Sequence, residues 1–195
     1  MKTFIIGLTG FAGSGKDTAA QFLDEALSAR QKKVRRMAFA DPIRAGLNAM
    51  GVPMHYMTER ALKETAVPGF SGASYRKLAQ TLGTEWGRAH MGRDFWVNLV
   101  EQRLLALAEL HRMPQVLIMT DVRLQSEADW IKLNGGILVH VQRPDIAPVR
   151  AHESEQLVEG IEHVLLNDGD LPALRARCDK LHLTVLAHMA LEGFA

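Results

Sequence analysis

The sequence has little cysteine, no excess of charge and no long apolar run, and each absence excludes a class of protein. Its 195 residues include one cysteine, Cys178, so no internal disulfide can form and nothing indicates an oxidising compartment. Lys and Arg total 23 against 22 Asp and Glu, and this balance argues against a protein that coats nucleic acid. No segment approaches the roughly 20 apolar residues that span a bilayer. We therefore expect a cytoplasmic globular protein, with no membrane or nucleic-acid partner, that acts on a small molecule.

A glycine-rich loop, GFAGSGKDT at residues 10–18, lies between an apolar strand predicted over 4–9 and an amphipathic helix. Its glycines let backbone N–H groups converge on an anion at the positive end of the helix, and Lys16 then reaches the β- and γ-phosphates. In this context the G-x-x-x-x-G-K pattern predicts a phosphate-binding loop. The predicted nucleotide-binding residues are Ala12, Gly13, Ser14, Gly15, Lys16, Asp17 and Thr18.

The residue after the lysine departs from the usual pattern of such loops. Asp17 stands where most of them carry the Ser or Thr that contacts Mg²⁺, and the hydroxyl follows one position later, at Thr18. Small nucleotide kinases often have this order, so it favours a kinase. Two interpretations of Asp17 stay open: it acts on the metal through water, or it is an acidic residue of the first helical turn.

Four more apolar runs predict strands, at 33–40, 116–120, 137–141 and 163–166. Helical patterns alternate with them, and this order predicts an α/β fold with a five-stranded parallel sheet and helices on both faces.

Asp121 and Arg123 follow the third predicted strand, at the carboxyl edge where open α/β sheets bind ligands. Asp121 is placed to organise Mg²⁺, and Arg123 is placed to meet phosphate charge. The alternatives are a helix cap for Asp121 and a surface position for Arg123, and we favour the functional interpretation of both.

Residues 41–94 are predicted to form an insertion in a single domain that spans 1–195. Within it, a helix predicted from Tyr75 to about His90 carries polar residues every four positions. These residues are Arg76, Gln80, Thr84 and Arg88. Because each four-residue step drifts by only about 40°, they share one broad face. Spacing alone favours a solvated face over a binding face.

The segment 143–155 contains Arg143 and has no clear apolar period. It is predicted to be either a short lid that brings cations over a transferring phosphate or an ordinary exposed loop.

Five segments together resemble the bacteriophage deoxynucleoside monophosphate kinases, in the nucleoside monophosphate kinase branch of the P-loop kinases. The matching segments are GSGKDT at 13–18, FADP at 39–42, residues 76–88 with LGTEWGR, DVR with a glutamate at 121–127, and NDG at 167–169. The phosphate-binding loop is shared by many enzymes, whereas the L-G-T-E-x-G-R block after an arginine is more distinctive.

The resemblance implies transfer of the γ-phosphoryl group of ATP, with Mg²⁺ as cofactor, to a deoxynucleoside 5′-monophosphate, giving the diphosphate and ADP. It assigns polar residues of the insertion to the acceptor, which reverses the preference drawn from spacing. The implied catalytic residues are Lys16, Asp121, Arg123 and Arg143. The implied adenine-edge residues are Asn167 and Asp168. The implied monophosphate-binding residues are Asp41, Arg44, Arg76, Gln80, Thr84, Glu85, Arg88 and Glu127. The implied metal ligands are Asp17, Thr18 and Asp121.

Two other functions remain open from the residues themselves. A phosphate monoester is largely a dianion at neutral pH and needs no strong base, whereas a hydroxyl acceptor needs a carboxylate such as Asp41. A kinase of a hydroxyl-bearing metabolite or coenzyme precursor, similar to dephospho-coenzyme A kinase, is therefore the main alternative. A nucleotide-dependent switch is the third hypothesis, although the sequence has no guanine-reading N-K-x-D string. The accepted bases, and the choice between monomer and homodimer, are left open.

Overall fold

The chain forms two compact units in the computed structural model, which describes residues 2–146 and 157–194. The first unit consists of Met1–Ala38 and Leu104–Ala195, and the second is Phe39–Arg103. The predicted insertion 41–94 falls within the second unit. Of the predicted lid 143–155, residues 147–155 lie outside the described residues.

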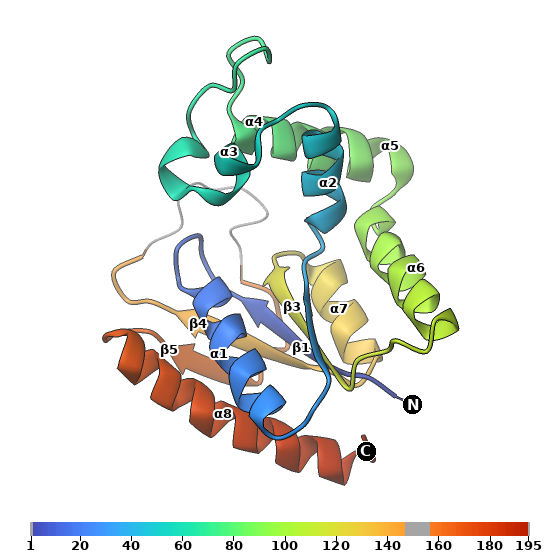
Figure 1. The fold of residues 1–195 in the computed structure, drawn as a ribbon, viewed down its shortest axis with the longest axis vertical. Coiled ribbons are helices and arrows are strands. Elements are labelled where there is room, and N and C mark those ends of the chain that lie inside the picture. Colours follow the sequence, from blue (N-terminus) through green and yellow to red (C-terminus); the bar gives the residue numbers. More distant parts are fainter. Residues whose placement is uncertain (1, 147–156, 195) are drawn as a thin grey trace. The chain divides into compact units, whose positions relative to one another are not determined.

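The first unit is built on a five-stranded sheet (Figure 1). Its strands are β1 (Phe4–Thr9), β2 (Val34–Met37), β3 (Val116–Val122), β4 (Ile137–Gln142) and β5 (His163–Leu166). They lie in the order β2-β3-β1-β4-β5, and every neighbouring pair is parallel. The predicted five-stranded parallel sheet is confirmed. Because all the strands run in the same direction, their carboxyl ends lie at one edge of the sheet. The phosphate-binding loop follows β1 at this edge.

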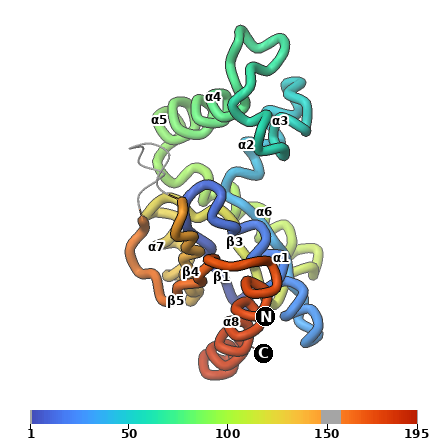
Figure 2. Tube along the Cα trace, turned by 90° about the vertical axis from the view of Figure 1, so that its left-hand side faces the viewer, coloured from blue at the N-terminus to red at the C-terminus, as the bar shows by residue number. Residues whose placement is uncertain are grey.

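Helices cover both faces of this sheet, as predicted (Figures 1 and 2). They are α1 (Lys16–Ala29), α7 (Gln125–Leu133) and α8 (Leu171–Leu191). Alternate residues of β1, among them Phe4 and Leu8, belong to one core cluster with α1 and α8. Gly7 lies on the other face, where a Cβ would stand 2.5 Å from Cδ1 of Ile131 in α7. The central strand is therefore buried on both sides, which explains its uninterrupted apolar sequence.

Three strands differ in length from their predictions, and β4 differs by one residue, since it ends at Gln142 instead of residue 141. The predicted strand 33–40 forms β2 only from Val34 to Met37, and residues 39 and 40 turn into the next helix. β3 extends two residues beyond the predicted 116–120, so Asp121 lies inside the strand. Between Gly7 and Thr9 of β1, the register on β3 advances from Met119 to Val122, which leaves one extra residue in β3. A bulge of this kind re-aims the side chains around it.

The second unit is helical and has its own apolar core. It contains α2 (Asp41–Ala49), α3 (Met54–Thr58), a 3₁₀ turn η1 (Arg60–Leu62), α4 (Tyr75–Gln80), a π-helical segment η2 (Thr81–Arg88) and α5 (Ala89–Met91). Helix α6 (Phe95–Glu109) begins here and ends in the first unit. The core residues are Ile43, Leu47, Val52, Met57, Val67, Tyr75 and Trp96.

The helix predicted from Tyr75 to about His90 is continuous through α4, η2 and α5, but its middle is a π-helix. In this segment the N–H of Ala89 bonds to the carbonyl of Thr84, five residues earlier. π-Helical turns are rare and occur most often at functional sites. Among the helices of the two described ranges, none has the length and apolarity to cross a membrane.

Candidate functional site

Two glycines of the phosphate-binding loop have backbone conformations and close neighbours that an L side chain would not fit. Gly10 has φ 138°, and a Cβ there would stand 2.4 Å from the carbonyl oxygen of Val141. Gly15, which caps α1, has φ 99°, and its Cβ would stand 2.5 Å from Nδ2 of Asn167. Because an L side chain would meet both strain and a clash, the loop can pack against its surroundings only with glycine.

Lys16 is folded back over the loop that precedes it. Its Nζ donates to the carbonyl oxygens of Gly10 at 2.5 Å and Phe11 at 2.9 Å, and the residue is only 8% exposed. These bonds hold the ammonium group at the N-terminus of α1, where backbone N–H groups and the helix dipole favour an anion. The arrangement fits the predicted contact with nucleotide phosphates.

Asn167, the residue directly after β5, bonds to the phosphate-binding loop. Its Nδ2 donates to the carbonyl oxygen of Ser14 at 2.8 Å, and its own N–H donates to Gln142 at 2.7 Å. The next residue, Asp168, accepts from Nη1 of Arg177 at 2.5 Å. The side-chain amide of Asn167 therefore restrains the phosphate-binding loop. The predicted adenine-edge role of the Asn167–Asp168 pair stays a prediction.

Glu127 is buried, and its carboxylate binds backbone. Its Oε2 accepts from the N–H groups of Arg123 at 2.8 Å and Leu124 at 3.1 Å, which caps α7 and fixes the turn after β3. Burial, and then the nearby Asp121 carboxylate, raise the pKa of Glu127 to about 8 against the opposing effect of these two N–H donors. The structure thus places Glu127 where it orients Arg123, and monophosphate binding by Glu127 stays a prediction.

His140 is a site residue that the sequence reasoning did not find. It lies on β4 beside Thr9 of β1, is 8% exposed, and its ring packs edge-on to Phe11 of the loop with centroids 6.4 Å apart. Burial, and then the positive charge of Lys16, lower the pKa of His140, so the imidazole is kept neutral beside the phosphate site. The signal was a polar residue within the buried apolar run of β4, Ile137–Val141.

The predicted metal ligands differ in exposure. Asp121 is 8% exposed, Thr18 is half-buried in the first turn of α1, and Asp17 is exposed. Within residues 2–146 and 157–194, no group of three His, Cys, Asp or Glu side chains is gathered to hold a metal. Mg²⁺ in nucleotide sites needs only one or two protein oxygens, with phosphates and water completing its shell. A hydroxyl and a buried carboxylate at the loop edge suit this chemistry, and their role as ligands stays a prediction.

Arg143 is exposed and follows β4 directly, where its carbonyl accepts from the N–H of Ile146 at 3.1 Å in a turn. The structure places it at the carboxyl edge of the sheet, the edge from which the phosphate-binding loop also leaves β1. Its catalytic role stays a prediction.

In the second unit the predicted acceptor residues lie on α2 and on the continuous helix from α4 into η2, and two of the arginines form ion pairs with carboxylates of the same unit. Nη1 of Arg44 lies 3.0 Å from Oδ1 of Asp41 on α2. Arg76, on α4, pairs through Nε with Glu64. The row continues along the same helix with three half-buried residues: Gln80, Thr84 and Arg88. Glu85 is exposed, and Lys77, 2.8 Å away, lowers its pKa.

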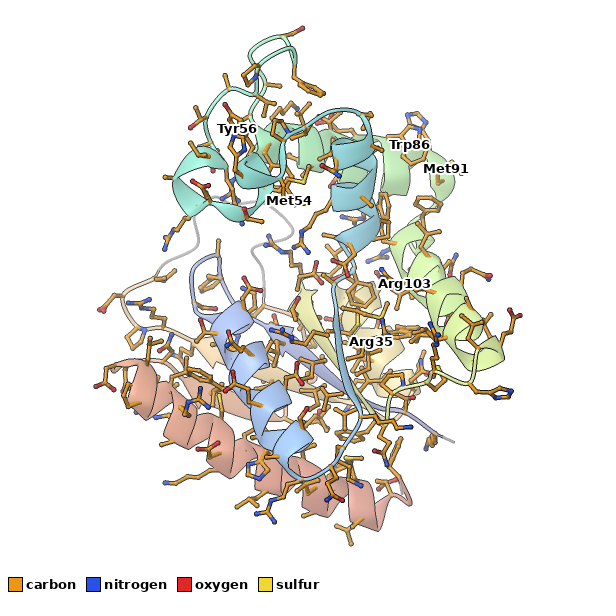
Figure 3. All side chains as sticks on the ribbon, in the orientation of Figure 1. Arg35, Met54, Tyr56, Trp86, Met91 and Arg103 are labelled. Carbon is orange, nitrogen blue, oxygen red and sulfur yellow. The ribbon has the colours of Figure 1, made fainter. Side chains whose placement is uncertain are left out.

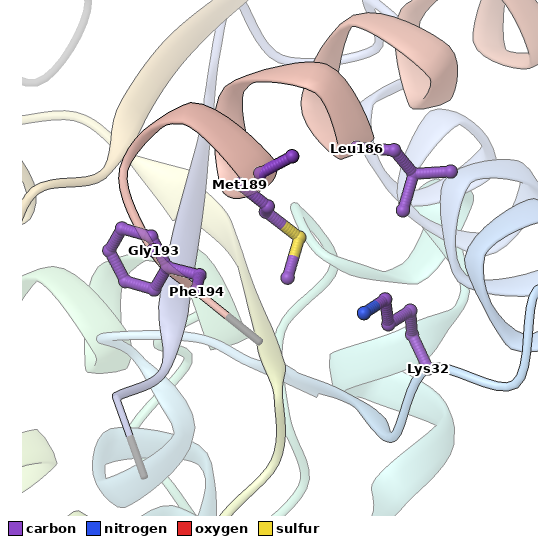
Figure 4. Close-up of a pocket in the computed structure, with 6 residues that line it drawn as sticks. Lys32, Leu186, Met189, Gly193 and Phe194 are labelled. Carbon is purple, nitrogen blue, oxygen red and sulfur yellow. The ribbon is translucent and has the colours of Figure 1, made fainter.

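The first unit has a hollow at the C-terminal end of α8 (Figure 4). It is lined by Lys32, Leu186, Met189, Ala190, Gly193 and Phe194. Lys32 precedes β2, so the hollow belongs to the amino edge of the sheet, whereas the phosphate-binding loop belongs to the carboxyl edge. Ligands of open α/β sheets bind at the carboxyl edge, and the loop is therefore the candidate site.

The parallel sheet and its phosphate-binding loop define a P-loop kinase, a phosphotransferase of the α/β class. The APS kinase of Mycobacterium tuberculosis, solved in complex with AMPPNP and APS, is similar in fold, with a TM-score of 0.50 at 13% identity over 97% of this chain and 98% of that one. A sequence profile of adenylylsulphate kinases also matches residues 2–62, which include the loop.

The remaining matches identify the family. The profile "Deoxynucleotide monophosphate kinase" matches residues 52–178. A protein of Acanthamoeba polyphaga mimivirus named "Putative deoxynucleotide monophosphate kinase" is 32% identical over 181 residues, covering 84% of this chain and 88% of its own. The chain belongs to the deoxynucleotide monophosphate kinase family. An origin in a bacteriophage stays a prediction.

Proposed function

We propose that this kinase transfers the γ-phosphoryl group of ATP to the phosphate of a deoxynucleoside 5′-monophosphate, giving the deoxynucleoside diphosphate and ADP. The observation that carries the proposal is the half-buried polar row on one continuous helix, from Arg76 through Thr84 to Arg88. It lies in the segment that the family profile matches. An arginine at each end and hydrogen-bonding groups between them suit a ligand with a phosphate and a polar base or sugar.

Phosphoryl transfer to a phosphate needs mainly positively charged groups placed around the reacting phosphates. Because a phosphate monoester has a second pKa near 6, the acceptor is already a nucleophile at neutral pH. Lys16, at the positive end of α1, would neutralise charge on the β- and γ-phosphates of ATP, and Arg123 would do so on the transferring group. Thr18 and Asp121 would hold Mg²⁺, which would supply the remaining positive charge at the phosphates. Glu127 would hold the turn that carries Arg123.

The second candidate is a kinase of a hydroxyl-bearing small molecule, favoured by the adenylylsulphate kinase profile over residues 2–62. This reaction needs a general base, for which Asp41 is the predicted residue. Asp41 forms an ion pair with Arg44, so its carboxylate already has a partner on the same helix. The family profile over 52–178 covers the polar row from Arg76 to Arg88, so we rank this function second.

A panel of acceptors separates the candidates. ADP release would be measured with ATP, Mg²⁺ and, in turn, the four deoxynucleoside monophosphates, their ribose forms, adenylyl sulphate and dephospho-coenzyme A. We expect turnover with at least one deoxynucleoside monophosphate. Turnover only with a hydroxyl acceptor would overturn the proposal, and ATP binding without turnover on any acceptor would favour the nucleotide switch.

A further inference from the structure

The π-helical segment that carries part of the acceptor row is held by a tryptophan that no sequence motif singles out. Trp96, the second residue of α6, is 7% exposed, and its Nε1–H donates to the carbonyl oxygen of Gly83 at 2.8 Å. Its ring lies against the same helix one turn later, where a Cβ on Gly87 would stand 2.4 Å from the ring carbon Cζ2. The indole thus spans Gly83 and Gly87, which are the two buried residues of η2.

This contact explains why the helix changes type here. Glycine is a poor α-helix former, and two glycines four residues apart leave a bare strip of backbone that a flat ring can approach. The indole fills the strip, and its N–H gives the carbonyl of Gly83 a strong partner inside the core cluster of the second unit. π-Helical turns are rare in proteins, and a buried tertiary hydrogen bond of this kind stabilises one.

The π-helical segment also changes how the acceptor row is aligned. In an α-helix a four-residue step overshoots a full turn by about 40°. A π-helical turn holds more residues, so the same step falls short of a full turn. The two deviations have opposite signs, so the α-helical step from Arg76 to Gln80 is offset by the π-helical steps that follow it. The row from Arg76 to Arg88 therefore stays more nearly in line than it would on a continuous α-helix.

We propose that Trp96 is a positioning residue of the acceptor site: through the Gly83 carbonyl and the Gly87 backbone it fixes the π-helical segment that brings Thr84 and Arg88 into line with Arg76. It sets the affinity for the deoxynucleoside monophosphate and leaves the affinity for ATP unchanged. This inference rests on the proposed function, because it assigns the row to the acceptor.

The first test compares Trp96→Phe, which keeps most of the ring but removes the N–H, with Trp86→Phe as a matched control. Trp86 lies in the π-helical segment itself, whereas Trp96 is on α6, and Trp86 is 44% exposed (Figure 3). For Trp96→Phe we expect the KM of the deoxynucleoside monophosphate to rise roughly tenfold, the effect of one lost buried hydrogen bond. The KM of ATP should stay within twofold. An unchanged monophosphate KM, or equal rises in both KM values, would overturn the inference.

The second test uses the unaltered chain and remains decisive if the variant does not fold. Hydrogen exchange of the indole N–H groups would be followed by NMR with and without saturating deoxynucleoside monophosphate. We expect the nucleotide to slow exchange at Trp96 more than at Trp86. Equal effects at the two indoles would count against the inference. Absence of turnover by the unaltered chain on every monophosphate would instead be a failure of the proposed function.

Discussion

The two compact units hold their charged groups in opposite ways. In the first unit Lys16, Asp121 and Glu127 are each at most 8% exposed, and both Lys16 and Glu127 are bonded to backbone. In the second unit Arg44 and Arg76 pair with carboxylates on a surface where each partner is a third or more exposed. The phosphate-binding loop is therefore preorganised by the fold, whereas Arg44 and Arg76, which we propose bind the acceptor, are neutralised by neighbours that a ligand can displace.

This difference indicates how each region would contribute to catalysis. Preorganised charge lowers the barrier because no reorganisation is needed as the transition state forms. An exposed ion pair stabilises a protein by only about 0–1 kcal/mol, so a phosphate dianion that bonds a guanidinium bidentately can displace the carboxylate. Changes in the first unit should then reduce the rate or ATP binding, and changes in the second should act mainly on acceptor affinity.

The largest effect is expected from Lys16→Met. Loss of the ammonium group removes charge stabilisation at the transferring phosphate, and we expect kcat/KM to fall by roughly a thousandfold or more. Coupled assay of ADP release measures it. Lys32→Met, at the hollow on the amino edge of the sheet, is the control and should stay near the unaltered rate. Near-normal turnover by Lys16→Met would remove the lysine from the mechanism.

Asn167→Asp tests the restraint on the loop. The carboxylate cannot donate to the Ser14 carbonyl, and it adds negative charge beside a site for anions, so the KM of ATP should rise roughly a hundredfold. Asn134→Asp is a matched control, because Asn134 also donates to a backbone carbonyl, that of Trp130 at 2.8 Å, but precedes β4 at the other edge of the sheet. Equal effects of the two changes would show that Asn167 has no particular role at the loop.

Arg76→Ala tests the second unit. Loss of a charged, forked donor should raise the KM of the deoxynucleoside monophosphate roughly thirtyfold and leave the KM of ATP unchanged. Lys77→Ala removes the neighbouring cation of the same helix, which is paired with Glu85, and should change the monophosphate KM less than threefold. Equal losses for ATP and acceptor would indicate a folding defect and would break the division between the two units.

Most of the sheet could be predicted because its strands are continuous apolar runs. β1 and β5 begin and end at the predicted residues. The bulge in β3 could not be predicted, because it depends on the register between β3 and β1. The order of apolar residues within β3 does not indicate it. The same limit applies to η2: residues spaced by four are compatible with α- and π-helices, and the segment depends on Trp96, 13 residues beyond Gly83.

Residues of the candidate site could be predicted where a sequence motif indicates their chemistry. They could not be predicted where only a tertiary contact places them. The loop pattern gave Lys16 and the glycines. His140 was missed because a single polar residue in a buried strand carries no spacing signal. Glu127 was found through the family resemblance, but its bonds to the backbone of Arg123 and Leu124 depend on the turn that follows β3.

Glu127→Gln tests how the buried carboxyl group of Glu127 affects the pH dependence of the stability of the first unit. In the unfolded chain Glu127 titrates at its ordinary pKa of 4.5, whereas in the folded chain its pKa is raised to about 8. Between these values the folded state binds more protons, so the stabilisation is complete below pH 4.5 and is lost as the pH rises through 8. Glutamine keeps a hydrogen-bond acceptor and does not titrate.

Urea unfolding of both proteins from pH 5 to pH 8 measures this effect. The free energy of unfolding of the unaltered chain should fall relative to that of Glu127→Gln by an amount on the order of 3 kcal/mol across the window. Parallel pH profiles would show that the Glu127 carboxyl group is not buried as the structure indicates.

The smallest effect, and the sharpest test of the comparison, is expected from Glu64→Gln. Glu64 neutralises Arg76 in the second unit, and the acceptor must displace it before the guanidinium can bind phosphate. Removing its charge should lower the monophosphate KM about threefold at low salt, and the gain should disappear at high salt as the exposed charges are screened. Glu59→Gln changes the net charge equally at an exposed position of the same unit and should have no such effect. A monophosphate KM that rises in Glu64→Gln would mean that the ion pair orients Arg76 for the acceptor, and the second unit would then be as preorganised as the first.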